Sequence, residues 1–262
     1  MSFYIQPSDG EPIEIRGYRY KEPSSSHKKY SSRRMRLPAR VDLRPFMTEV
    51  ETQGDSNSCV ANAVAGAYEY LLKRHWGEEG YDVSRLFIYF NARLEDEALE
   101  DDGAEIGQAI EGLQQYGACC EEIWPFDMDL INEEPSDDAY DEASGFLIED
   151  VSVIPTELDT WKKCLADGYP IIFGLLLYGS FDSHYKRKGL VPIPSKKESK
   201  RDSHEGHAML CVGYSDRDKV FIVRNSWGPS WGDKGYCYIP YSYIINNNII
   251  LEIHGSFDES RR

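Results

Sequence analysis

The sequence predicts an α+β protein, because helical patterns occupy its first half and short strand patterns its second half. The chain has 262 residues, of which 41% are hydrophobic and 13% aromatic, so it is long enough to bury a sizeable core. Its longest apolar run, residues 170–178, is much shorter than the ~18–20 residues that a membrane helix needs. We therefore expect a protein without membrane contact.

Charge is divided unevenly along the chain. Residues 1–40 carry nine Lys/Arg and four Asp/Glu, a net charge of +5, whereas the whole chain carries −16. An acidic body disfavours general nucleic-acid binding. Residues 1–36 are interpreted as a basic, polar N-terminal arm that is extended and partly mobile. We expect self-contact of this arm with the acidic body; whether it occupies a cleft, binds a partner or is a disordered tail stays open.

The N-terminus shows no basic cap followed by an apolar block, so no secretory signal is visible. Six cysteines in a chain of this length do not make a disulfide scaffold. Both observations favour a cytoplasmic or otherwise reducing compartment; a virion or delivery into a host cell is compatible with them. Adjacent Cys119 and Cys120 are interpreted as packing thiols, and neither a metal nor a cofactor is expected. We expect a monomer.

The first helix begins at a cysteine. Residues 56–76 read SNSCVANAVAGAYEYLLKRHW, and Val60, Val64, Ala67 and Leu71 form one apolar stripe at helical spacing. A thiol at a helix start lies where unpaired backbone N–H groups lower its pKa. Cys59 is therefore a candidate nucleophile rather than an ordinary buried filler.

Two more helices and then a series of strands follow. Ser84 is the expected N-cap of a helix through residues 85–94, and a third helix covers residues 105–116 and is closed by Gly117. After residue 150 the runs FLIEDVSVI, YPIIFGLLL, HAMLCVGYS, KVFIVRNSW, GYCYIPYSY and NNIILEIHG are typical of strands, interrupted by one helix around TELDTWKKCLADG.

His207 is the histidine best placed to activate Cys59. It stands at the head of a strand run, after Gly206, and a strand end can aim an imidazole across a cleft. Asn225 ends the next run, and adjacent antiparallel strands would bring Asn225 beside His207, where its amide can orient the ring. Gln53, six residues before Cys59, can donate to a developing oxyanion together with the Cys59 backbone N–H.

Three blocks of this sequence resemble the signatures of papain-like cysteine peptidases. They are QGDSNSC, GHAMLCVGY and NSWGPSWGDKGY. LPARVDLR resembles the start of the mature domain, and the chain is most similar to bacterial and viral members without a long propeptide. His207 follows Cys59 by 148 residues, within the ~130–150 expected. Residues 37–255 carry the resemblance.

The resemblance implies a two-lobed fold, with a helical left lobe, an antiparallel β-barrel right lobe and the active-site cleft between them. We assign the helical lobe to about 50–148, the β-rich lobe to about 149–255 and a C-terminal tail to 256–262. It further implies that Trp227 shields the His–Asn pair from water. Substrate-binding positions are expected at the four residues Asn57, Ser58, Gly206 and Trp227.

The function expected from the resemblance is that of a cysteine endopeptidase acting on a protein or peptide. Cys59 would attack the carbonyl and form a thioester acyl-enzyme, Gln53 would hold the oxyanion, and His207, oriented by Asn225, would act as the base. Two alternatives stay open. The same fold could pass the acyl group to an amine as a transpeptidase or amide ligase, or it could be a non-catalytic peptide-binding relative.

Overall fold

A computed structural model of the protein describes residues 4–5, 13–14, 17–21, 28–31, 35–77, 81–94, 99–148, 151–181, 188–198 and 205–246. Its helices are α1 (Cys59–Trp76), α2 (Arg85–Asn91), α3 (Ile106–Gln115), α4 (Asp137–Ala143), α5 (Leu158–Ala166) and α6 (Tyr241–Asn246), with short 3-10 helices η1 (Arg44–Phe46) and η2 (Met128–Leu130). Its strands are β1 (Tyr4–Ile5), β2 (Ile13–Glu14), β3 (Lys28–Lys29), β4 (Arg40–Asp42), β5 (Ser152–Val153), β6 (Ile171–Leu177), β7 (Glu205–Ser215), β8 (Val220–Arg224) and β9 (Tyr236–Pro240). The expected α+β class is confirmed.

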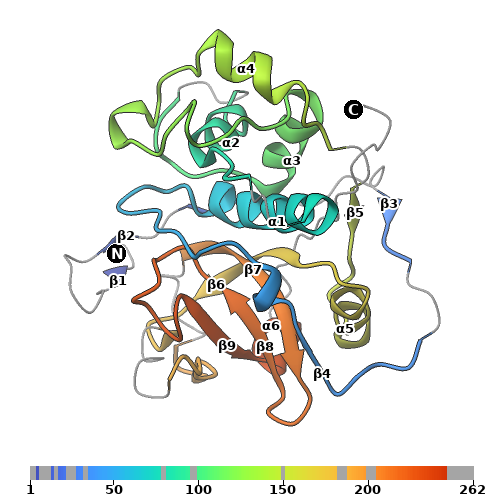
Figure 1. Ribbon diagram of the computed structural model, residues 1–262. Coiled ribbons are helices and arrows are strands. Elements are labelled where there is room, and N and C mark those ends of the chain that lie inside the picture. The colour runs from blue at the N-terminus through green and yellow to red at the C-terminus, as the bar shows by residue number, and fades with distance from the viewer. Residues whose placement is uncertain are drawn as a thin grey trace.

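Helix α1 lies between two groups of elements (Figure 1). Helices α2, α3 and α4 lie on one side of it, and an antiparallel sheet with α5 and α6 lies on the other. Because it is covered on both sides, most of α1 is buried around its whole circumference, which is typical of a helix inside a larger protein. The residue at its N-terminus therefore sits between the two groups.

The predicted helix ends match the observed ones closely. Ser84 caps α2 by accepting a hydrogen bond from the backbone N–H of Phe87. Gly117 follows α3 with a φ of 77°, a left-handed conformation that favours glycine. The sequence missed α4, which is capped by Ser136. Only Ala139 and Ala143 of this helix are buried, so no stripe of large apolar residues marks it.

The main sheet is organised around the long strand β7. One edge of β7 pairs with β6 through its first half and with β4 through its last residues, while β8 pairs with the opposite edge. Pairing with β8 starts at Leu210, which lies opposite Arg224, the last residue of β8. The next residue of the chain, Asn225, therefore lies beside the first part of β7, which carries His207 and does not pair with β8.

Several predicted strands differ in extent from the observed ones. The run FLIEDVSVI contributes only β5, which pairs in parallel with β3 of the N-terminal arm. Tyr241–Asn246 continues from β9 as α6 rather than as strand, because the strand meets its end at Pro240. The predicted last strand and the C-terminal tail 256–262 lie outside the described residues. No described helix combines the length and the apolar character needed to span a membrane.

Trp161 contacts two aromatic side chains of the core, which gives a test of stability. Trp161 of α5 is fully buried, with ring centroids 5.4 Å from Phe173 and 4.9 Å from Phe221. Trp161→Ala should lower the free energy of unfolding by about 3–5 kcal/mol, because it removes buried area and leaves a cavity. Chemical denaturation measures this. Ile193→Ala, at a position 57% exposed, should change it by less than about 0.5 kcal/mol. Equal losses in the two variants would contradict this packing.

Candidate active site

Cys59 is the first residue of α1, and its side chain is fully buried. Its Sγ accepts a hydrogen bond from the backbone N–H of Ala208, the neighbour of His207, at 3.4 Å. The residue before it, Ser58, is held by Asn62, whose Nδ2 donates to the Ser58 carbonyl at 3.0 Å and to its Oγ at 3.0 Å. The nucleophile candidate is therefore fixed by α1 and lies beside the head of β7, as expected from the sequence.

His207 and Asn225 form the predicted pair. The Nε2 atom of His207 lies 2.7 Å from the Oδ1 atom of Asn225. The other ring nitrogen, Nδ1, is buried and has no hydrogen-bond partner among the described residues. Trp227 stacks on the imidazole with centroids 4.7 Å apart and an interplanar angle of 24°. The indole thus covers one face of the ring, where the expected shielding of the His207–Asn225 contact would act.

Gln53 is buried in the segment that precedes α1, with 3% of its surface exposed. Its Nε2 donates to the carbonyl of Ser56 at 2.7 Å, and its Oε1 accepts from the Oγ of Ser226 at 2.5 Å. Its backbone N–H donates to the carbonyl of Ser226 at 2.8 Å. An amide N–H₂ group carries two hydrogens, so a second donor is left for another acceptor.

Burial disfavours the charged forms of both Cys59 and His207. It raises the pKa of the Cys59 thiol to about 12, although the backbone N–H groups of Ala208, Val60 and Cys59 itself lower it. Burial also lowers the pKa of His207 to about 4, against the hydrogen bond to Asn225 that raises it. The lowering expected from the helix start is thus outweighed by desolvation, which disfavours both charged forms.

The N-terminal segment Gly17–Lys21 lies over this pair. A Cβ atom on Gly17 would fall 2.5 Å from the Cys59 Sγ and 2.5 Å from the Asn57 carbonyl oxygen, so only glycine fits there. Tyr18 donates its backbone N–H to the Gly206 carbonyl at 3.2 Å, and its side chain is only 6% exposed. A Cβ on Gly174 would come within 2.1 Å of the Tyr18 ring. The ring therefore fills a space that this glycine leaves open.

The same segment is held from the helical side. The N–H of Arg19 donates to the Ala104 carbonyl at 2.9 Å, and the N–H of Ala104 donates to the Gly17 carbonyl at 3.0 Å. The Nζ of Lys21 lies 3.2 Å from an Oε of Glu105. Gly206 and Gly174 belong to the sheet, whereas Ala104 and Glu105 precede α3. Gly17–Lys21 therefore spans both sides of the site.

The predicted substrate-binding residues lie in different surroundings. Asn57 and Gly206 touch the covering segment, and Trp227 touches His207. The Ser58 side chain is turned inward, where its Oγ lies 2.6 Å from the Oγ of Ser56. Sequence reasoning missed Asp101, whose carboxylate accepts the Asn57 N–H at 2.9 Å.

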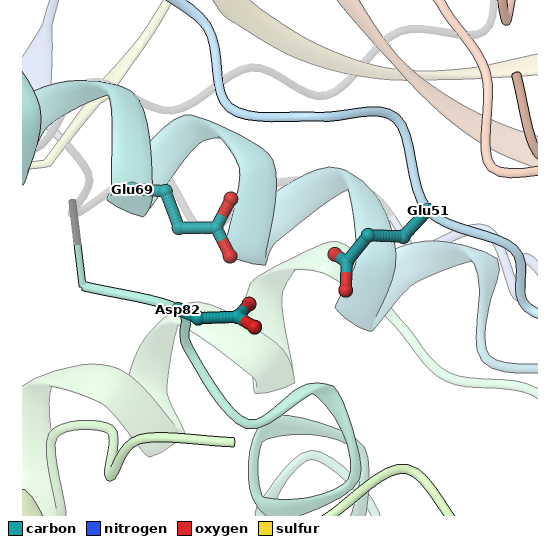
Figure 2. Close-up of side chains that lie close together, drawn as sticks. All are labelled: Glu51, Glu69 and Asp82. Atoms are coloured by element: carbon teal, nitrogen blue, oxygen red, sulfur yellow. The ribbon is translucent and has the colours of Figure 1, made fainter. Parts of the chain in front are cut away.

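Three carboxylates face one another from α1, from the segment before α2 and from the segment before Gln53 (Figure 2). Oxygen atoms of Glu51, Glu69 and Asp82 all lie within 4.8 Å of one another. Burial raises the pKa of Glu51 to about 8 and that of Glu69 to about 7. Glu69 accepts hydrogen bonds from the Thr48 hydroxyl at 2.5 Å and the Val83 N–H at 3.2 Å. These contacts belong to a protein network around Glu69.

Comparison with known proteins decides the family. The family model for papain family cysteine proteases matches residues 37–253. The chain belongs to the papain family of cysteine proteases. A peptidase C1-like protein of Acanthamoeba polyphaga mimivirus is 36% identical over 219 residues, which cover 80% of this chain and 69% of the viral protein. Mouse cathepsin K is 28% identical over 213 residues, and the match spans 60% of its length.

Solved structures of the papain family show the same fold. The crystal structure of xylellain, a cysteine protease from Xylella fastidiosa, has a TM-score of 0.83 and 33% identity, covering 92% of this chain and 96% of that one. Digestive procathepsin L 3 of Tenebrio molitor has a TM-score of 0.73 at 20% identity. These neighbours confirm the two-lobed papain fold, in which the helical lobe and the antiparallel sheet flank the cleft. The family match, the viral relative and xylellain confirm the enzyme class, a thiol protease among the hydrolases.

Proposed function

We propose that this papain-family enzyme is an endopeptidase in which Cys59, His207, Asn225 and Gln53 act together on a peptide bond. The observation that supports this proposal is the convergence of four separate segments: the start of α1, the head of β7, the residue after β8 and the segment before α1. Polar residues that are buried only for structural reasons would not need to come together at one place. The backbone N–H of Ala208, the residue after His207, contacts the Cys59 sulfur, so the base and the nucleophile that acyl transfer requires belong to one site.

In the proposed reaction the Cys59 sulfur forms a bond to the substrate carbonyl carbon after its proton passes to His207. Gln53 Nε2 and the Cys59 backbone N–H stabilise the negative oxygen that develops. The C–N bond then breaks, and the leaving amine takes the proton from His207. Water next gives a proton to His207 and attacks the thioester, which releases the acid and restores the thiol. Asn225 fixes the ring orientation throughout, and Trp227 keeps the contact dry.

The segment Gly17–Lys21 holds this peptidase closed. Cys59 and His207 are both fully buried beneath it, so a substrate carbonyl cannot reach the sulfur while it is in place. In this proposal the contact expected between the arm and the body keeps substrate away from the Cys59 sulfur. The arm has no helical element among its described residues; its contacts here include backbone hydrogen bonds, the Tyr18 ring, a side-chain hydrogen bond from Arg19 to Gln108 and an ion pair.

A peptide-cleavage assay on the opened enzyme tests the reaction. The full chain carrying Gly17→Ala, in which the new Cβ cannot share space with the Cys59 sulfur, should cleave internal bonds of a peptide library, and mass spectrometry identifies the products. With a competing amine present, hydrolysis products should still dominate. Products capped mainly by the amine would instead favour a transpeptidase or amide ligase. A chain that binds peptides and cleaves none would favour the non-catalytic relative.

A further inference from the structure

Arg85 is a buried cation that the proposed reaction does not use. It is the first residue of α2 and only 6% exposed. One terminal nitrogen, Nη2, lies 3.1 Å from an Oε of Glu51 and 2.9 Å from an Oε of Glu121. The guanidinium also lies over the Phe126 ring, 4.1 Å from its centroid. Burying a cation is costly unless its partners are well placed, so this position requires an explanation.

The other terminal nitrogen joins the two parts of the site. Nη1 donates to the Thr52 carbonyl at 3.1 Å, and Thr52 directly precedes Gln53. The same Nη1 lies 3.4 Å from the Oδ1 of Asn62, and the Nδ2 of Asn62 holds Ser58, directly before Cys59. One guanidinium thus connects the segment that carries the oxyanion donor with the helix that carries the nucleophile.

Several other contacts of that segment run to the opposite lobe, while the Thr48 hydroxyl donates to Glu69 of α1 and the Gln53 amide donates to Ser56. Thr52 bridges Trp227, the Gln53 N–H donates to Ser226, and the N–H of Gly228 donates to the Glu51 carbonyl at 3.0 Å. Arg224, the last residue of β8, holds the earlier part of the segment through the Thr48 carbonyl at 3.0 Å. Without Arg85 the segment would stay bound to the sheet, but the Thr52 carbonyl would lose its hydrogen bond to α2 and, through Asn62, its connection to α1.

We infer that Arg85 is a positioning residue that sets the Gln53 amide relative to the Cys59 sulfur. The inference rests on the proposed function. Its carboxylate partners, including Glu51 in the cluster of Figure 2, hold the guanidinium in place rather than bind a substrate. Because the oxyanion forms only on the way to the transition state, a misplaced donor lowers kcat and leaves KM nearly unchanged.

The test compares two reactions of the same sulfur in the full chain carrying Gly17→Ala. Peptide hydrolysis develops an oxyanion, whereas alkylation by iodoacetamide develops none. Arg85→Met should lower kcat about 10²-fold, in the range found for losing one oxyanion donor, with KM and the alkylation rate within about threefold of the reference. Arg85→Lys should recover part of kcat. In a Gln53→Ala background, Arg85→Met should cost little more.

Arg93 supplies a matched control in the same lobe. It is fully buried, donates to the carbonyls of Tyr89 and Ile131, and lies over the Tyr89 ring, 3.7 Å from its centroid, but none of these contacts reaches the Gln53 segment. Arg93→Met should lower stability and leave kcat, counted per titratable Cys59, unchanged. Rates are also normalised to the folded fraction measured by chemical denaturation, so a poorly folded fraction does not lower them.

Each other outcome has a defined meaning. If Arg85→Met lowers hydrolysis and alkylation equally, Arg85 supports the fold in general and the inference is overturned. Equal kcat in Arg85→Met and its reference overturns it too, as does an effect that adds fully to that of Gln53→Ala. A reference chain whose Cys59 is alkylated but which cleaves no peptide overturns the proposed function, and the inference with it.

Discussion

Replacing Cys59 with alanine is expected to abolish peptide cleavage by the opened enzyme. The sulfur forms the acyl bond in the proposed reaction, and no other described cysteine lies beside His207. Loss of the nucleophile in a comparable triad lowers kcat by about 10⁶-fold, and the remaining oxyanion donors leave only about 10³–10⁴-fold over water. The Cys59→Ala chain should therefore show no turnover above background in the peptide-library assay.

Cys237→Ala is the control for this loss. Cys237 is also a fully buried thiol whose pKa burial raises, but it lies on β9 within the sheet. This variant should lose some stability by leaving a small cavity and should keep its kcat. The Cys59→Ala chain should still bind peptides, because only the sulfur is removed. Cleavage that survives Cys59→Ala and is lost in Cys237→Ala would rule out the assigned nucleophile.

Opening the arm should raise the alkylation rate of Cys59 by about 30- to 50-fold at neutral pH. Burial raises the pKa of this thiol from an ordinary 9.0 to about 12, which suppresses its thiolate fraction near pH 7 about 10³-fold, and opening the arm should remove part of that burial. A thiolate of lower pKa is a weaker nucleophile, which cancels part of the gain. Easier access of the reagent adds to it.

Two substitutions open the arm in different ways. Gly17→Ala introduces a Cβ 2.5 Å from the Cys59 sulfur, and Tyr18→Ala removes the ring that fills the space beside Gly174. Gly107→Ala, at a position where a Cβ meets nothing within 4 Å, is the matched control and should behave as wild type. If neither arm variant reacts faster than the control, the arm does not limit access to Cys59.

The pH dependence of alkylation shows in which direction the pKa of the Cys59 thiol is shifted. A raised thiol pKa means that the thiolate is scarce below about pH 12, so the wild-type rate should keep rising as the pH increases through the alkaline range. In the opened variants the rate should level off near or below pH 9, where the thiol of an exposed site is already ionised. A wild-type profile that levels off at the same pH as the opened variants would contradict a buried, neutral thiol.

Much of the fold was readable from the chain because its patterns are local. The stripe of apolar residues after Cys59 predicted α1, Ser84 predicted the cap of α2, and Gly117 predicted the end of α3. Helix α4 was missed because it buries only two alanines. Tyr241–Tyr243 was assigned to a strand because its aromatic residues are typical of strands, and the structure places it in α6.

Part of the candidate site was likewise predictable from the sequence, and part of it was not. The types and order of Gln53, Cys59, His207 and Asn225 indicated their chemistry, and the pairing of antiparallel strands predicted that His207 and Asn225 meet. The covering of Cys59 by Gly17 left no signal, since a glycine and a tyrosine in a polar arm have no periodicity. Arg85 left none either, because a helix-start arginine is usually solvated and nothing local shows that it is buried.

The sequence by itself determined the α+β class, the papain family and the residues that carry the proposed chemistry, because periodicity, caps and motif spacing are written within short stretches of chain. Only the tertiary structure decided that burial raises the pKa of the thiol, that Gly17 of the arm covers it and that Arg85 contacts both Thr52 and Asn62 of the nucleophile helix. Those properties depend on desolvation and on contacts between residues far apart in sequence, and both exist only once the chain has folded.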